Sequence, residues 1–82
     1  MTNLILIQGG SVMPLLLAPE NETLTILTVR GDDKVRKHLE SLGIVPEGKI
    51  IVLSQENGGV IVKINDTRLA LDHNIARGIL VK

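Results

Sequence analysis

Apolar side chains recur with a helical period in the middle of the chain, over residues 34–48, KVRKHLESLGIVPEG. Val35, Leu39 and Leu42 occupy positions i, i+4 and i+7, which places them on one face of a helix. Pro46 cannot continue a helix, because it lacks a backbone N–H and its ring clashes with the preceding turn. The pattern therefore predicts one short amphipathic helix that ends before Pro46.

The two ends of this helix carry their own signals. Asp32 or Asp33 can cap the N-terminus, where a carboxylate accepts a backbone hydrogen bond and meets the positive end of the helix dipole. Gly43 stands where a left-handed residue closes many helices, since glycine adopts positive φ without a Cβ penalty. Ile44 is the next residue, and we expect it to pack back on Leu39.

The remaining apolar pattern is that of short β-strands, predicted at residues 23–30, 49–54, 60–64, 67–71 and 79–81. In the first of these the alternation changes phase between Ile26 and Leu27, which predicts a bulge or a strong bend. In the fourth, Leu69 and Leu71 are expected to point inward. An apolar segment at residues 14–18 is expected to be a buried entry to the domain.

Polar and glycine-rich segments separate the strands. Gly48 comes after the turn that succeeds the helix, and Gly58 and Gly59 belong to a predicted hairpin loop at residues 55–59. Its Asn-Gly pair favours positive φ. Asn65-Asp66 is a predicted tight turn between the next two strands.

Asp72 can cap a single helical turn, residues 73–77, that Gly78 ends before the last strand. The predicted order is then β-α-β-β-β-turn-β. Short strands joined by tight turns are typical of a small SH3-like β-barrel. We therefore predict a mainly β domain over residues 13–82, with one short helix between its first two strands and a helical turn before its last.

Residues 1–12 differ from the rest of the chain. An apolar run, Leu4–Ile7, is followed by Gly9 and Gly10, which break any regular element. The segment is either an extension upstream of the domain, with Met13 as an alternative start, or it adds an edge strand that pairs with the barrel or with a second copy.

Composition excludes several classes of function. The 82 residues suffice for one domain, and nine basic and nine acidic residues give a net charge of zero. This balance predicts no nucleic-acid partner and leaves open a weak homo-oligomer. The chain has no cysteine and no aromatic residue, so disulfides, cysteine-based zinc sites, aromatic polyproline grooves and base-stacking platforms are all excluded.

The apolar runs of the sequence are too short for a membrane-spanning helix. The longest nearly apolar run, Met13–Ala18, is far shorter than the roughly 20 residues that a spanning helix needs. The N-terminus also lacks the basic region of a signal peptide. We therefore predict a cytoplasmic protein that does not insert into a membrane.

Catalytic and metal chemistry find little support. No Ser/His/Asp order or phosphate-binding glycine loop stands out, so no enzyme activity is predicted. Candidate metal ligands are His38, Glu40, Asp72 and His73, but a metal site needs three or four converging ligands, and Asp72 is explained as a cap. We predict no metal or cofactor site.

Three pieces of sequence between residues 14 and 81 are distinctive in their order and spacing. They are Leu42-Gly43-Ile44 with Pro46 and Gly48, the Gly58-Gly59 hairpin with its Val/Ile strand, and Arg68-Leu69-Ala70-Leu71 with Ile75-Ala76 and Ile79-Leu80-Val81. Together they resemble the FeoA family, a module also found at the C-terminus of some metal-dependent repressors. Glu47 departs from the pattern, because many members have the proline and the glycine adjacent.

The resemblance implies a cytosolic accessory or regulatory protein of bacterial ferrous iron uptake. Its implied partner is the membrane ferrous iron transporter, contacted at the cytosolic GTPase region. Two alternatives stay open: a free-standing regulatory interaction module related to the repressor domains, and a direct metal sensor.

Small barrels commonly bind partners in a cleft between helix, loops and strands. The predicted rim consists of Ile44, Val45, Pro46 and the 55–59 hairpin. Val45 is the better contact candidate, because helix termination already explains burial of Ile44. Lys34, Arg36 and Lys37 form a predicted basic helix face that would speed association with an acidic partner.

Overall fold

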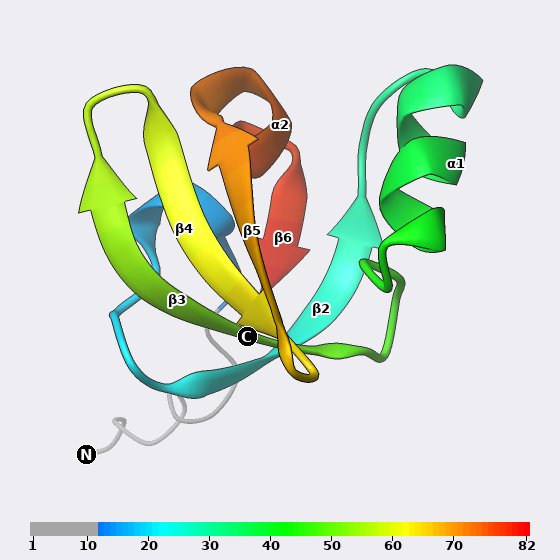
Figure 1. Cartoon of the computed structure of the whole chain (residues 1–82). Helices are drawn as coiled ribbons and strands as arrows, with labels where there is room; N and C mark the ends of the chain where they lie inside the picture. Colours follow the sequence, from blue (N-terminus) through cyan, green and yellow to red (C-terminus); the bar gives the residue numbers. More distant parts are fainter. Residues whose placement is uncertain (1–11) are drawn as a thin grey trace, which may run out of the picture.

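The computed structural model describes residues 12–82, which form one six-stranded sheet with three short helical segments (Figure 1). The strands are β1 (Met13–Pro14), β2 (Thr23–Val29), β3 (Lys49–Glu56), β4 (Gly59–Ile64), β5 (Thr67–Asp72) and β6 (Ile79–Val81). The helices are the 3₁₀ segment η2 (Leu15–Leu17), α1 (Asp33–Ser41) and α2 (His73–Arg77). The predicted SH3-like fold class, with α1 between β2 and β3 and α2 before β6, is confirmed.

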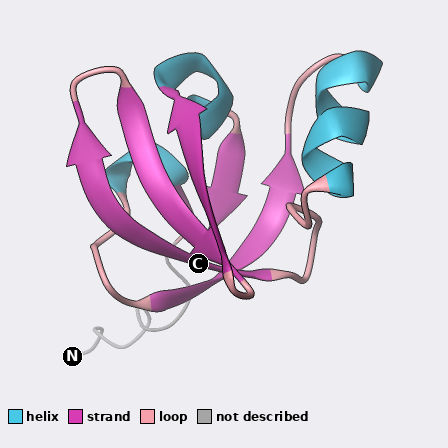
Figure 2. Ribbon diagram, in the orientation of Figure 1, coloured by secondary structure: helices cyan, strands magenta, loops and turns pink. Residues whose placement is uncertain are grey.

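The strands lie in the order β1-β6-β2-β3-β4-β5, and every neighbouring pair is antiparallel. The sheet curls so that β3, β4 and β5 stand opposite β6 and β2 (Figure 2). Within residues 12–82 no ladder joins β5 to β1, so the barrel is partly open. β5 is therefore an edge strand.

The core is built from aliphatic side chains alone. Its largest fully buried members are Leu15, Ile26, Leu39, Ile44, Ile50 and Ile79. Alternate residues of each strand point inward, as in β4, where Val60, Val62 and Ile64 are buried. Helix α2 adds Ala76, so the interior is filled without aromatic residues.

The predicted irregularity in β2 is confirmed, because its register with β6 shifts between Ile26 and Thr28. A second shift, between Val52 and Ser54 of β3, was not predicted. The entry segment buries Leu15 and Ala18 as expected, but it also contributes the unpredicted two-residue strand β1, and its Leu17 is 73% exposed.

The predicted 55–59 loop is too long, since Glu56 already pairs with Gly59 and only Asn57 and Gly58 form the turn. The prediction of positive φ at this Asn-Gly pair is also wrong, because neither Asn57 nor Gly58 has a positive φ. The hairpin therefore closes without a left-handed residue at Asn57 or Gly58. Gly59 serves packing instead, because a Cβ there would lie 1.9 Å from the carbonyl oxygen of Leu71.

The tight turn at Asn65-Asp66 is confirmed, with Asn65 at φ 56°. The N-terminal prediction, an extension over residues 1–12 or a strand at Leu4–Ile7, lies outside the described residues except for Val12. Along residues 12–82 the helices are too short or too polar to cross a bilayer.

Candidate functional site

Helix α1 begins at an aspartate cap. Asp32 accepts a hydrogen bond from the backbone N–H of Val35 at 2.9 Å, and its own backbone is extended. Asp33 lies in the first turn and forms an ion pair with Arg36 one turn later. Of the two predicted caps, Asp32 is the residue that caps, and Asp33 pairs with Arg36 instead.

The other end of α1 closes in a Schellman motif. The backbone N–H of Ile44 donates to the carbonyl of Leu39 at 2.9 Å, and that of Gly43 to Glu40 at 3.0 Å. Gly43 has φ 96°, which confirms the predicted left-handed glycine. This reversal carries Ile44 into the core, where it is 1% exposed beside Leu39.

Of the three apolar residues that the periodicity places on one helical face, Leu39 is buried, whereas Leu42 is 36% exposed. Leu42 is the C-cap of α1, and the chain turns back immediately after it. The reversal delivers Ile44 to the core instead.

A tight turn occupies residues 45–48. The backbone N–H of Gly48 donates to the carbonyl of Val45 at 3.0 Å, with Pro46 second and Glu47 third in the turn. Glu47 has φ 76°, the conformation that the third residue of a type II turn requires and that glycine or asparagine usually supplies. Its N–H donates to the carbonyl of Ile26 at 2.8 Å, which ties the turn to β2.

These elements enclose a groove of about 310 Å³, which we call the α1 groove. It is lined by Thr28 and Val29 of β2, by Asp33, Arg36, Lys37 and Glu40 of α1, and by Ile44, Val45 and Pro46 of the segment after α1. Val45 is half-buried and Pro46 is exposed. The structure thus gathers five of the six predicted contact residues around one groove, all except Lys34.

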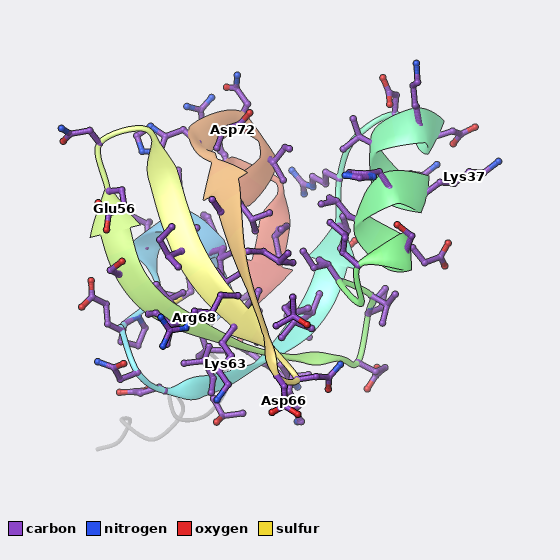
Figure 3. All side chains as sticks on the ribbon, viewed as in Figure 1. Lys37, Glu56, Lys63, Asp66, Arg68 and Asp72 are labelled. Atoms are coloured by element: carbon purple, nitrogen blue, oxygen red, sulfur yellow. The ribbon has the colours of Figure 1, made fainter. Side chains whose placement is uncertain are left out.

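The helical wall of the groove is balanced in charge. Arg36 and Lys37 face the groove together with Asp33 and Glu40, two cations with two anions. Arg36 donates to the Asp33 carboxylate, while Lys37 extends outward from α1 (Figure 3). The predicted basic face is therefore divided, because Lys34 lies outside the groove and acidic residues offset the other two.

The predicted rim is also divided. The β3–β4 hairpin lies on the opposite side of the sheet from α1 (Figure 1) and borders a different, shallow groove of about 350 Å³. This second groove is lined by Glu56, Gly58, Gly59, Val60, Ile61, Ala70, Leu71 and Asp72. The hairpin and the turn after α1 therefore cannot form one cleft.

Four residues that line the α1 groove were not predicted as contact residues: Thr28, Val29, Asp33 and Glu40. A signal for two of them was present. Asp33, Arg36, Lys37 and Glu40 stand at i, i+3, i+4 and i+7, so they share one helical face. That face is polar, so it carries none of the apolar periodicity that predicts a buried surface.

The α1 groove combines apolar lining residues, Val29, Ile44, Val45 and Pro46, with a helical wall that carries two cations and two anions. This arrangement suits a protein segment that presents an apolar side chain flanked by polar groups. The four candidate metal ligands do not converge: His38 and Glu40 lie on α1, whereas Asp72 and His73 lie at the start of α2. Residues 12–82 contain no group of three His, Asp or Glu side chains that could hold a metal ion.

The model of the FeoA domain family matches residues 13–82. The fold is similar to that of a crystal structure of an Iron Uptake Regulatory Protein (FeoA), with 25% identity, 88% of this chain and 97% of that chain covered, and a TM-score of 0.79. It is also similar to the solution structure of a FeoA protein from Chlorobium tepidum, with 28% identity, 84% and 68% coverage, and a TM-score of 0.77.

A manganese-dependent transcriptional repressor shares the fold at 22% identity and a TM-score of 0.77. This alignment covers 85% of the present chain but only 40% of the repressor. The search of curated proteins found no match.

Proposed function

The chain belongs to the FeoA domain family, and on that premise we propose that it is a cytosolic accessory protein of ferrous iron uptake. In this proposal it binds the cytosolic GTPase region of the membrane ferrous iron transporter, and the α1 groove is the contact site. It regulates or supports the transporter and does not carry the ion. The relative described as an iron uptake regulatory protein supports the assignment to iron uptake, because the two chains align over nearly their whole lengths.

The observation that carries the contact site is Val45. The Schellman motif requires an apolar residue at Ile44, but it makes no such demand on Val45. Val45 is nevertheless apolar and half-buried, and it lines the α1 groove. It is held there by a turn that forces Glu47 into a left-handed conformation, the kind of local strain that is found at binding sites.

Calorimetric titration with the soluble domain of the transporter tests this site. We expect Val45→Asp to weaken binding by roughly tenfold or more, because a charge in a desolvated contact is costly. Leu17→Asp is the matched control, since Leu17 is 73% exposed on η2 and lies outside the groove. It should bind as the wild type does.

Charge reversal gives a second matched pair. Lys37→Glu changes a residue of the groove wall, whereas Lys34→Glu changes a neighbour outside it. We expect only Lys37→Glu to alter the association rate and its salt dependence. Equal binding by the wild type and Val45→Asp would remove the α1 groove from the interface.

The alternative is a free-standing regulatory module. The likeness to the manganese-dependent repressor is one of fold, and this chain spans less than half of that protein. Failure of the folded wild type to bind the transporter domain, with or without guanine nucleotide, would favour this alternative.

A further inference from the structure

Within residues 12–82, the edge of β5 that faces away from β4 pairs with no other strand. Along an antiparallel strand, alternate residues direct their N–H and C=O groups to opposite sides. The β4–β5 turn pairs Ile64 with Thr67, so Arg68, Ala70 and Asp72 direct theirs away from β4. Outside the strand ladders and helices, no backbone hydrogen bond within residues 12–82 involves these three residues.

The outward face of β3, β4 and β5 is polarised in charge. Its side chains form three cross-strand rows: Ile51, Lys63 and Arg68; Ser54, Ile61 and Ala70; Glu56, Gly59 and Asp72. Lys63 and Arg68 lie at one end of the β4–β5 hairpin, whereas Glu56 and Asp72 lie toward the other (Figure 3). Cations therefore flank one side of an uncharged middle row, and anions flank the other.

This arrangement is unfavourable in a single copy. Lys63 and Arg68 are directly opposite one another, and like charges in that position destabilise a sheet. The described residues contain one ion pair, between Arg36 and Asp33, so neither Lys63 nor Arg68 has an acidic partner there. The two cations are thus available to an acidic group that arrives beyond the edge of β5.

We propose that two copies of this chain associate through β5, antiparallel and about a two-fold axis at Ala70. This register places Arg68 opposite the partner's Asp72, and Asp72 opposite the partner's Arg68. The sheet becomes continuous across the two copies. Ala70 then lies opposite itself, and its small side chain allows the strands to approach closely.

Other two-fold registers pair the charges badly. An axis at Arg68 or at Asp72 sets a residue against its own copy, with like charges opposed. An axis at Leu69 sets Asp66 against Asp72, again two anions. An axis at Leu71 sets Ala70 against Asp72. Only the axis at Ala70 makes two opposite-charge pairs, so the charge pattern specifies the register.

The neighbouring strands extend this complementarity. Lys63 lies behind Arg68 in the same row, and Glu56 lies behind Asp72, with Gly59 between them lacking a side chain. Asp72 uses Oδ1 to accept from the N–H of Ile75 at 2.8 Å, which leaves Oδ2 for the arginine. A net charge of zero adds no long-range repulsion between two copies. This surface is separate from the α1 groove and does not depend on the proposed function.

Sedimentation equilibrium of the full chain from micromolar to millimolar concentration tests the dimer. We expect a wild-type dimer, at least tenfold weaker association in Arg68→Glu, and a monomer in Ala70→Pro, which removes an edge N–H. Asp72→Asn should also weaken association while keeping a side-chain oxygen to cap α2. Lys34→Glu is the charge-matched control and should dimerise as the wild type does.

Disulfide trapping tests the register. The chain has no cysteine, so a single introduced thiol reports on one position. Ala70→Cys should oxidise to a covalent dimer, whereas Ile61→Cys in the same row should not, because the two copies of that residue would be about 14 Å apart. A monomeric wild type, a dimer that Arg68→Glu leaves intact, or equal trapping at both positions would overturn the proposal.

Discussion

Helix α1 and helix α2 begin in the same way, each with an aspartate whose carboxylate accepts from the backbone N–H three residues later. They differ in length and in their place in the fold. The nine residues of α1 bury one side chain completely, Leu39, and the helix stands at the flank of the sheet (Figure 1). The five residues of α2 bury Ala76 and join β5 to β6.

The difference assigns a role to each helix. Helix α2 is a short connection between β5 and β6, and it packs on the core through Ala76. Helix α1 is held by Leu39 and by the turn that succeeds it, so its polar face is left to form one wall of a groove. A cap therefore shows where a helix begins. How much of the helix is buried shows whether it has a face left for a partner.

Truncating Leu39, which anchors α1 in the core, should destabilise the fold more than the other substitutions. Leu39 is 1% exposed, and Leu39→Ala should lower the free energy of unfolding by about 3 kcal/mol, because a buried cavity remains. Leu42→Ala, at a side chain that is 36% exposed, should cost less than about 1 kcal/mol. Urea denaturation measures both, and similar losses would contradict the assignment of Leu39 as the anchor.

The glycines that end the two helices offer a second comparison. Gly43 has φ 96°, and a Cβ there would lie 3.1 Å from Cγ2 of Ile64, so Gly43→Ala should cost about 1–2 kcal/mol. Gly78 has φ −88°, which any residue adopts. Gly78→Ala should therefore cost less, its main demand being a 3.1 Å approach to the carbonyl oxygen of Arg30.

Both glycine variants can be compared in one denaturation series with the wild type. A Gly43→Val variant extends the series, since a β-branched side chain tolerates positive φ less well than alanine does. An unchanged midpoint in Gly43→Ala and Gly43→Val would show that the left-handed residue is not needed to close α1.

The smallest change in stability is expected at Glu47, which lies in the turn after α1 and has φ 76°. Glu47→Gly should raise the free energy of unfolding by about 0.5 kcal/mol, because glycine relieves the left-handed strain at some entropic cost. Asn65→Gly is the control, since asparagine already tolerates its φ of 56°. Thermal denaturation should show a gain for Glu47→Gly alone, and a loss would mean that the Glu47 side chain contributes a stabilising contact.

Local chemistry made most of the fold predictable. The N-cap, which is Asp32 of the two predicted candidates, and the reversal at Gly43 each act within a few residues, and α1 ends before Pro46 as predicted. The bulge in β2 was visible as a change of phase at Ile26. These features need no knowledge of the rest of the molecule.

The features that were missed depend on tertiary structure. β1 has two residues, Met13 and Pro14, which are too few to show an alternation. Asp33 and Glu40 share a helical face with Arg36 and Lys37 in the sequence, but that this face lines a groove depends on where α1 lies relative to β2 and to the segment after α1. The register shift in β3 between Val52 and Ser54 was also missed, because it is defined by pairing with β4.

The position of β6 in the sheet has a consequence for how the protein folds. β6 comes after every other strand in the chain, yet it lies between β1 and β2, where Val81 pairs with both Met13 and Ile26. The meander of β3, β4 and β5 can form through short turns, but the barrel is completed only when two distant parts of the chain meet. A chain cleaved between α2 and β6 would keep the meander and leave β1 and β2 with unpaired edges, which are sites of aggregation.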